Sequence, residues 1–421
     1  MKSMRRSPFF LVFFSILTAL MTAAAALSFG SAISVDDCAR LGLPVLMIET
    51  EGGKQVRSKE RYIRASYALL DPSGEGDSGQ CKIRGRGNTT WKTRELLKKP
   101  YLLKLDEERP LLGFPAARKW VLMANAADKT QLRNSYAEHL SSEIWSSLPW
   151  TPRSRYISLF LNGKYEGLYA LTEKIEAVRG RVPVSEDEGS FVFEVNYRMD
   201  KDFSFISGNG AAFSVRTNLG SVTDEEFMRR KDVIQRAEDA LFSSDEGGPG
   251  GWRDYFDEDS FVDWYLINEL TKNHDARFQF SCYLYYDAAA GKIFMGPPWD
   301  FDISAGNISW DSCEIPEGFW VRDSLWYERF FEDPDFTAAV KKRWSDSRGE
   351  LLESLGWIRR AGEALLPAIE LDDAVWRSIG RRKWPHTPGW RERKTYGSEI
   401  EYMTGWLERR IVWMDGALGG L

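Results

Sequence analysis

The sequence predicts an α+β protein, in which a strand-rich first half precedes a helical second half. Up to about residue 221, short apolar runs are separated by Gly, Asn, Asp and Ser, which is typical of strands and turns. The segments 156–161 and 167–172, with Asn162-Gly163 between them, predict a hairpin. From Asp224 onward, longer segments with fewer turn residues predict mainly helices.

Other segments of the first half also predict strands, namely 43–48, 101–105, 120–124 and 191–195. The run WVLMA at 120–124 has no polar residue and predicts a buried strand.

A helix is predicted after this buried strand. Asp128 is expected to cap it, and the helix is expected to run to about Ser147. Apolar residues such as Leu132 and Tyr136 recur at helical spacing and should face the core. Arg133, beside them, is compatible with a surface charge.

The second half alternates predicted helices with two short strands. Helices are expected at 225–242 and 261–272, the latter capped by Asp259 and Ser260. Strand patterns follow at 282–286 and 292–294, and the chain is predicted to be helical from Trp326 on. Seven tryptophans of this last part favour helix packing over a sugar-binding platform: Trp344, Trp357, Trp376, Trp384, Trp390, Trp406 and Trp413.

Composition limits the classes of function. The chain has 421 residues, 43% of them hydrophobic, which is enough to bury a large core. Its formal net charge of −6 argues against a nucleic-acid partner, which calls for a basic face.

The first 32 residues have the layout of a secretory signal peptide. Lys2, Arg5 and Arg6 precede an apolar stretch at 9–27, and small residues follow it. The stretch is also long enough for an uncleaved membrane anchor. We therefore expect an exported protein that is periplasmic, at the cell surface or extracellular, with this segment as its only membrane contact.

Four cysteines allow three disulfide pairings, and isolated buried thiols are the alternative. Because their spacing fits no zinc motif and the chain has only three histidines, a Cys/His metal site is not expected.

The stretch 263–306 carries the most chemistry. Asp275 follows an apolar helical run, and Asp300 and Asp302 flank Phe301 after a Gly-Pro-Pro-Trp turn. In an extended segment, residues two apart point the same way, so Asp300 and Asp302 could share one Mg²⁺. Asp275 could then hold a nucleophile across from that ion, as in phosphoryl transfer. The alternative is that these aspartates cap a helix and satisfy backbone donors in turns.

A basic turn lies earlier in the chain, in the run IRGRGNTTW at 83–91. Its backbone N–H groups, with Arg84 and Arg86, could lie over phosphates. Lysines 98, 99 and 104 add positive charge nearby, although most such turns are plain hairpins. Glu173 ends a predicted strand and is either an acid lining a site or a solvated side chain.

Several runs together resemble the CotH kinase family, named for a spore-coat protein H. They are IRGRGNTTW with KKPYLLKL, WVLMANAADKTQLRN, LNGKYEGLYALTEKIE, FVDWYLINELTKNHDA and GPPWDFDISAGN. They occur in the family's order, and with the helical tail they cover about residues 40 to 418.

The resemblance implies an atypical protein-kinase-like fold with a strand-rich N-lobe, a helical C-lobe and a helical C-terminal extension. Its boundaries would be 33–184 for the N-lobe, 185–345 for the C-lobe and 346–421 for the extension, after the leader at 1–32. It also implies ATP and Mg²⁺ as cofactors and transfer of the γ-phosphate to Ser or Thr of a partner protein, such as a surface or coat protein.

Roles carry over residue by residue. Asp275 resembles the catalytic aspartate, and Asp300, with Asp302, resembles the metal-binding segment. The loop with Arg84, Arg86, Gly87 and Asn88 resembles the loop that covers the nucleotide. Lys99 or Lys104 resembles the phosphate-contacting lysine, and Glu173 is a further candidate for the nucleotide site.

One position departs from the family pattern. Ser281 stands where the family commonly has an Asn that supplies a second metal ligand. A catalytically weak or inactive kinase-fold binding protein at the surface or envelope is therefore the alternative function, and the scarcity of ATP outside the cell favours it. A third class, in which Asp275 and Asp300 form an acid–base pair for glycoside hydrolysis, leaves the basic turn unexplained.

Overall fold

Seven strands of the first half close into a barrel in the computed structural model, which describes residues 33–74, 76–184, 189–215, 222–243 and 251–421. The expected signal segment at 1–32 lies outside the described residues. The barrel strands are β1 (Val45–Thr50), β2 (Ile63–Leu70), β3 (Asp77–Gly85), β4 (Tyr101–Arg109), β5 (Ala117–Met123), β6 (Ser154–Leu161) and β7 (Lys164–Glu173).

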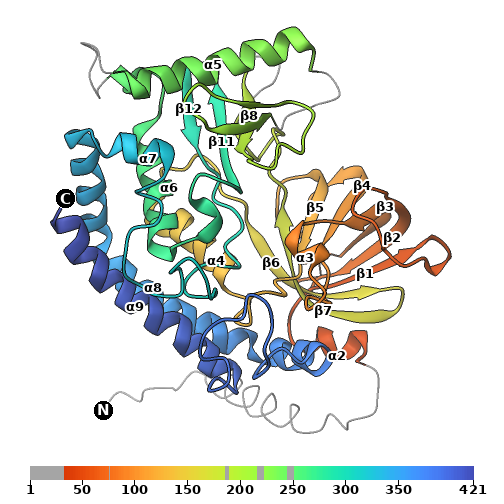
Figure 1. Cartoon of the computed structure of the whole chain (residues 1–421). Helices are drawn as coiled ribbons and strands as arrows, with labels where there is room; N and C mark the ends of the chain where they lie inside the picture. The colour runs from red at the N-terminus through yellow and green to blue at the C-terminus, as the bar shows by residue number, and fades with distance from the viewer. Residues whose placement is uncertain (1–32, 75, 185–188, 216–221, 244–250) are drawn as a thin grey trace, which may run out of the picture.

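The barrel closes through a parallel pair, β1 with β6, while its other neighbours are antiparallel in the order β1-β2-β3-β4-β5-β7-β6. Side chains of alternate positions, such as Leu103 and Leu105 of β4, fill its interior. The hairpin expected from Asn162-Gly163 is β6–β7. In Figure 1 the barrel stands apart from most of the helices.

A second sheet belongs to the other part of the molecule. Its strands are β8 (Phe191–Val195), β9 (Ser204–Ile206), β10 (Ala212–Val215), β11 (Cys282–Asp287) and β12 (Lys292–Met295). They are antiparallel in the order β12-β11-β8-β10-β9, so the two strands predicted between the helices join strands from before residue 216.

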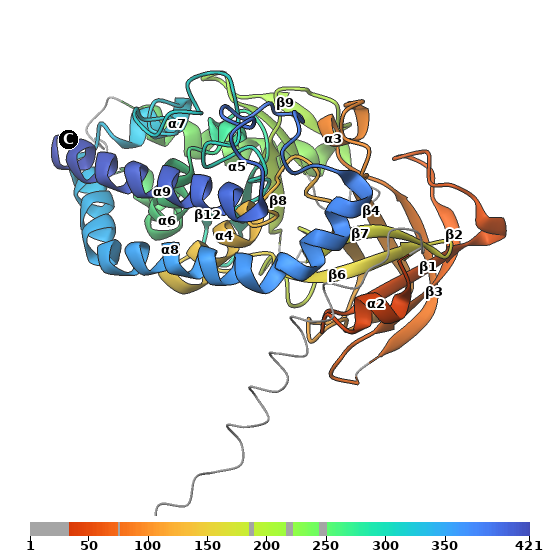
Figure 2. The same cartoon turned by 90° about the horizontal axis from the view of Figure 1, so that it is seen from below.

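Most of the helices lie on the side of the second sheet, while α2 and α3 lie beside the barrel (Figure 1). The helices are α2 (Val35–Ala39), α3 (Thr89–Lys92), α4 (Arg133–His139), α5 (Asp224–Phe242), α6 (Glu258–Thr271), α7 (Leu325–Phe330), α8 (Pro334–Trp376) and α9 (Tyr396–Gly419). The two longest, α8 and α9, run side by side, as Figures 1 and 2 show. None of the described helices is long and apolar enough to span a bilayer.

Helix α6 is buried along nearly its whole length, which explains why its sequence has no clean apolar stripe. The cap predicted at Asp259 and Ser260 is wrong by two to three residues. Asp257 is the N-cap, and its side chain accepts the backbone N–H of Ser260.

Helix α4 is also shorter than predicted. It ends at His139, and a π-helical turn continues it to Ile144 rather than to Ser147. Leu132 occupies the N-cap position, while Asp128 accepts the backbone N–H of Arg133 from outside the helix, at 2.9 Å.

The mixture of strands and helices confirms the α+β prediction. The closed barrel is a feature that the sequence did not indicate. The two-lobed kinase arrangement remains a prediction.

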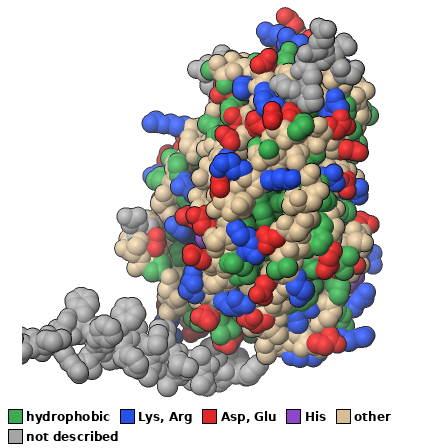
Figure 3. Space-filling model, turned by 90° about the vertical axis from the view of Figure 1, so that its left-hand side faces the viewer, with side chains coloured by type: hydrophobic (Ala, Val, Ile, Leu, Met, Phe, Trp, Pro, Cys, Tyr) green, Lys and Arg blue, Asp and Glu red, His purple; other side chains and the backbone are tan. Residues whose placement is uncertain are grey.

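All four cysteines lie in the described part and are buried free thiols, so the disulfide alternative is wrong. On the face shown in Figure 3, acidic and basic side chains are interspersed and form no broad basic patch.

Candidate functional site

A cavity of about 370 Å³ lies where the loop after β3 meets the segments that follow α6 and β12. The lining residues come from six parts of the chain: Arg86, Gly87, Asn88, Thr89, Thr90 and Pro100; Met123, Ala124, Asn125 and Ala126; Arg198; His274, Asp275, Phe280 and Ser281; Asp300, Asp302 and Ile303; Trp310 and Trp384. The three aspartates that the sequence singled out therefore line one cavity.

Asp275 lies in a short 3-10 turn just after α6. The helix ends at Lys272, whose backbone is left-handed (φ 46°) and whose ammonium donates to the carbonyls of Ser312 and Glu317, at 2.7 and 2.6 Å. His274 lies beside Asp275, with Nδ1 3.4 Å from Oδ1 of the aspartate and Nε2 2.9 Å from Oδ2 of Asp311. Burial opposes protonation of His274, but these two carboxylates outweigh it and raise its pKa.

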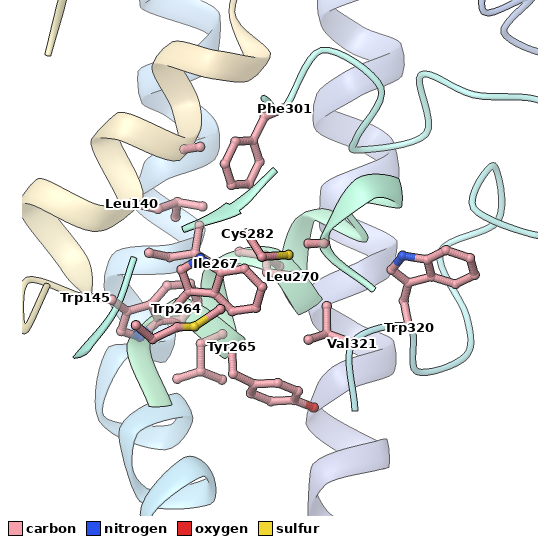
Figure 4. Close-up of a cluster of buried hydrophobic side chains, with 14 of the residues drawn as sticks. Leu140, Trp145, Trp264, Tyr265, Ile267, Leu270, Cys282, Phe301, Trp320 and Val321 are labelled. Carbon is pink, nitrogen blue, oxygen red and sulfur yellow. The ribbon is translucent and has the colours of Figure 1, made fainter. Parts of the chain in front are cut away.

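Asp300 and Asp302 both line the cavity, but the segment that carries them is not extended as expected. The backbone of Asp300 is left-handed, with φ 68°, which is uncommon for a residue other than glycine. Between the two acids, Phe301 is buried, and Figure 4 shows its ring directed towards the hydrophobic cluster. The backbone N–H of Phe301 donates to Oδ1 of Asn134 at 2.9 Å. The packed ring and this hydrogen bond fix the segment so that both neighbours face the cavity.

Arg133 stabilises the same segment through hydrogen bonds. It is buried, pairs with the carboxylate of Asp128, and donates to the carbonyls of Ser304 and Ala305 at 2.9 and 3.2 Å. The sequence-based interpretation of Arg133 as a surface charge is thus wrong. Its role was hidden because these carbonyls lie about 170 residues away in the chain.

The carboxylates of the cavity repel one another. Burial and the charge of Asp275 raise the pKa of Asp300 to about 6, although Arg86 and the Ser281 hydroxyl act in the opposite direction. Burial and the charges of Asp300 and Asp275 raise the pKa of Asp302 well above its usual range. A site with this much uncompensated negative charge favours a cation.

Magnesium fits the donors that are present. Among the residues the structure describes, no group of three or more His, Cys, Asp or Glu side chains is placed to enclose a metal ion. Mg²⁺ is commonly held by only one or two carboxylates, with water and substrate phosphates at its other positions. Asp300 and Asp302 match that pattern, and the cavity has room for the phosphates.

The loop after β3 brings positive charge to the same cavity. Burial lowers the pKa of Arg86, while the charge of Asp300 favours its protonated form. Its guanidinium lies over the ring of Trp299, 5.3 Å from the centroid, and donates to the sulfur of Met123. Gly87 has φ 85°, and a Cβ there would lie 2.4 Å from the hydroxyl of Thr90, so only glycine fits this turn.

Four other residues predicted for the nucleotide site lie outside the cavity lining. The ammonium of Lys99 donates to the carbonyls of Thr90, Trp91 and Thr93, behind the loop. Arg84 donates to the carbonyl of Lys59 and stacks on Tyr62. Lys104 of β4 lies in register with Lys82 of β3 on one side and Lys119 of β5 on the other, and it does not line the cavity.

The fourth, Glu173, is buried and accepts from the backbone and guanidinium of Arg153, at 3.1 and 3.0 Å. Of the two interpretations left open for it, neither fits, because it is a buried partner of an arginine. Lys98 is also committed elsewhere, since it forms a buried ion pair with Asp372 of α8 at 2.7 Å.

Sequence reasoning missed Arg198, His274, Trp310 and Trp384 as cavity residues. Trp384 had been assigned to helix packing with six other tryptophans. It lies instead in the segment between α8 and α9, with its ring 6.0 Å from that of Trp310. No local signal separates it from the packing tryptophans, because the folded chain alone brings it to the cavity.

Taken together, the chain is an α+β protein in which a carboxylate cluster and an arginine-bearing, glycine-containing loop line one cavity. The family model described as CotH kinase protein matches residues 83–414, so the chain belongs to the CotH kinase family. A comparison with curated proteins gave no match.

Proposed function

We propose that this protein is an exported, kinase-like phosphotransferase that transfers the γ-phosphate of ATP to Ser or Thr of a partner protein. The observation that carries the proposal is the common cavity of Asp275, Asp300, Asp302 and the loop at Arg86. Membership of the CotH kinase family supports it.

Asp300 and Asp302 are the residues that would hold Mg²⁺, which when bound offsets the charge of the phosphates. Arg86, which lines the same cavity, would donate to phosphate oxygens, for which a guanidinium is well suited. The backbone N–H groups of the turn at Gly87 and Asn88 add further donors.

Asp275 would orient the acceptor hydroxyl and receive its hydrogen bond. It lies in the same cavity but on a different segment from Asp300, so nucleotide and acceptor can approach from separate sides. His274 positions the carboxylate of Asp275 and is itself held between Asp311 and the stacked ring of Trp320.

The test is phosphoryl transfer from labelled ATP. Purified full-length protein with MgATP should label itself or a partner, and Asp300→Ala should not, while retaining its fold by circular dichroism. The proposal fails if wild type and Asp300→Ala label equally, or if neither transfers phosphate to itself or to any Ser or Thr substrate.

A binding protein without turnover is the second candidate, favoured by one contact. Ser281 donates to Oδ2 of Asp300 at 3.3 Å, where the family pattern has an Asn as a second metal ligand. A hydroxyl is the poorer ligand of the two. Calorimetry with nucleotide and magnesium distinguishes a binding protein from a chain that has simply lost the site. Nucleotide binding with magnesium but without phosphoryl transfer favours the binding protein.

A further inference from the structure

We propose that the acceptor of this site is an acidic protein segment, recognised by Arg198 and Arg277. The inference rests on the proposed phosphotransferase function, and it names the chemistry of the substrate beside Asp275. Both arginines are exposed.

The two side chains share an arrangement. The guanidinium of Arg198 lies over the ring of Phe280, 4.2 Å from its centroid, and that of Arg277 lies over the ring of Trp320, at 4.9 Å. Neither arginine forms an ion pair with any residue that the structure describes. Stacking fixes the plane of each guanidinium and leaves its edge N–H groups free to bind a carboxylate or phosphate bidentately.

Both rings are attached to the candidate catalytic turn. Phe280 donates its backbone N–H to the carbonyl of Asp275 at 3.3 Å. The indole N–H of Trp320 donates to the carbonyl of His274 at 3.2 Å, and its ring stacks on the His274 ring. The two cations are therefore held near Asp275 through its own neighbours, where the residues flanking an acceptor hydroxyl would lie.

The loop that carries Arg198 is ordered by side-chain contacts. Asn196 accepts the backbone N–H of Arg198 at 3.2 Å and donates to Asp200 and to Ser214, at 2.9 and 3.1 Å. The backbone N–H of Tyr197 donates to the carbonyl of Gln279. A pre-ordered cation binds an anion with less loss of conformational freedom.

Two of the nearby acids already have other partners, while Asp300, on which the charge of Arg198 acts, is the candidate metal ligand. Asp200 is taken up by Asn196 and Lys201, and Asp311 by His274. Arg86 and Arg198 both line the cavity and both act on the charge of Asp300, but Arg86 packs over Trp299, whereas Arg198 and Arg277 are exposed. We therefore assign Arg86 to ATP and the two exposed arginines to the acceptor.

The experiment uses the full-length protein and three peptides with one central Ser, flanked by Glu, Gln or Lys. Binding is measured by fluorescence anisotropy without nucleotide, and transfer by kcat/KM with MgATP. We expect the Glu peptide to be favoured over the Lys peptide by at least about tenfold, because a charge-assisted hydrogen bond contributes about that factor. The preference should weaken at high salt.

Charge reversal makes the test specific. Arg198→Glu and Arg277→Glu should each weaken the Glu peptide about tenfold, and the double variant should favour the Lys peptide. Arg391→Glu is the matched control, because Arg391 is exposed and stacks on Trp390, a ring that neither lines the cavity nor stacks on His274 as Trp320 does.

The inference fails if wild type favours the Lys or Gln peptide, binds none of them, or keeps its preference in the double variant. If phosphate is transferred but the Glu peptide is not the favoured substrate, the acidic-segment inference is refuted and the proposed phosphotransferase function stands. Binding of the Glu peptide that responds to charge reversal, without transfer to any Ser, refutes the proposed function and leaves the acidic-segment site standing.

Discussion

The hydroxyl of Ser281 donates to Oδ2 of Asp300 across 3.3 Å, and both residues have left-handed backbones, with φ 57° and 68°. Non-glycine residues in this conformation are uncommon and concentrate at functional sites, where the surrounding structure enforces them. The pair therefore links the one departure from the family pattern to the candidate metal ligand.

Replacing Ser281 by Asn should raise the rate of phosphoryl transfer. Asn tolerates the left-handed backbone better than most residues and offers a carbonyl oxygen as a ligand. Because a change in metal ligation typically alters activity by about tenfold or more, we expect an increase of about tenfold. Transfer kinetics at saturating magnesium measure it, with Ser281→Ala as the control that lacks any ligand; an Asn variant no faster than wild type contradicts the account.

Removing the charge of Asp300 should stabilise the metal-free protein at neutral pH. The pKa of Asp300 is about 6 in the folded protein, above its ordinary value, so the folded state binds more protons between about pH 4 and pH 6. The free energy of unfolding then falls as pH rises through this window. Because a pKa about two units above the ordinary value corresponds to about 3 kcal/mol, Asp300→Asn should gain up to about that much at pH 7.5 and almost nothing at pH 4.

Chemical denaturation in EDTA at the two pH values gives this comparison. Added Mg²⁺ should reduce the difference, since the ion binds the charged form of the wild type. A variant that is equally or less stable than wild type at pH 7.5 would show that Asp300 is not destabilised by its neighbours.

Arg86→Ala should raise the KM for ATP by about 10- to 100-fold, because a charged hydrogen bond to phosphate is lost. Arg84→Ala is the matched control, since that arginine comes from the same run but donates to backbone carbonyls outside the cavity. Steady-state kinetics test the pair, and equal effects of the two changes would remove Arg86 from the nucleotide site.

The buried pair of Arg410 and Glu269 should dominate the stability of the helical part. Arg410 of α9 donates to a Glu269 oxygen at 2.6 Å, and the carboxylate also accepts the backbone N–H groups of Trp320, Val321 and Arg322. Arg410→Met leaves the carboxylate without its cation and should cost about 3–5 kcal/mol. Its exposed neighbour Arg409, changed to Met, should cost less than about 0.5 kcal/mol in the same denaturation assay.

Local sequence patterns predicted many of the helices and strands of this fold. The strand patterns of β6 and β7 and the turn between them predicted their hairpin, and the helix expected at 225–242 agrees with α5 to one residue. Closure of the barrel was out of reach, because it depends on the parallel pairing of β1 with β6, about 110 residues apart. Nothing within either strand specifies that partner.

The candidate site was likewise predictable from the sequence only in part. Asp275, Asp300 and Asp302 were identified from short runs, and the fold places them on one cavity. Lys99 looked equally suitable as a charge near the loop, yet its ammonium turns to three carbonyls behind it. Side-chain direction at the edge of a loop depends on the tertiary contacts, which residue type and spacing do not report. Arg198 and Trp384 were missed for the same reason.

Calorimetry of MgATP binding to Asp275→Asn and Asp300→Asn distinguishes the two roles assigned to these acids of one cavity. We expect Asp275→Asn to bind MgATP at least as tightly as wild type, because the acceptor side alone is changed, and Asp300→Asn to lose the magnesium-dependent part of binding. Unchanged binding in Asp300→Asn, or an equal loss in both variants, would contradict this assignment of roles.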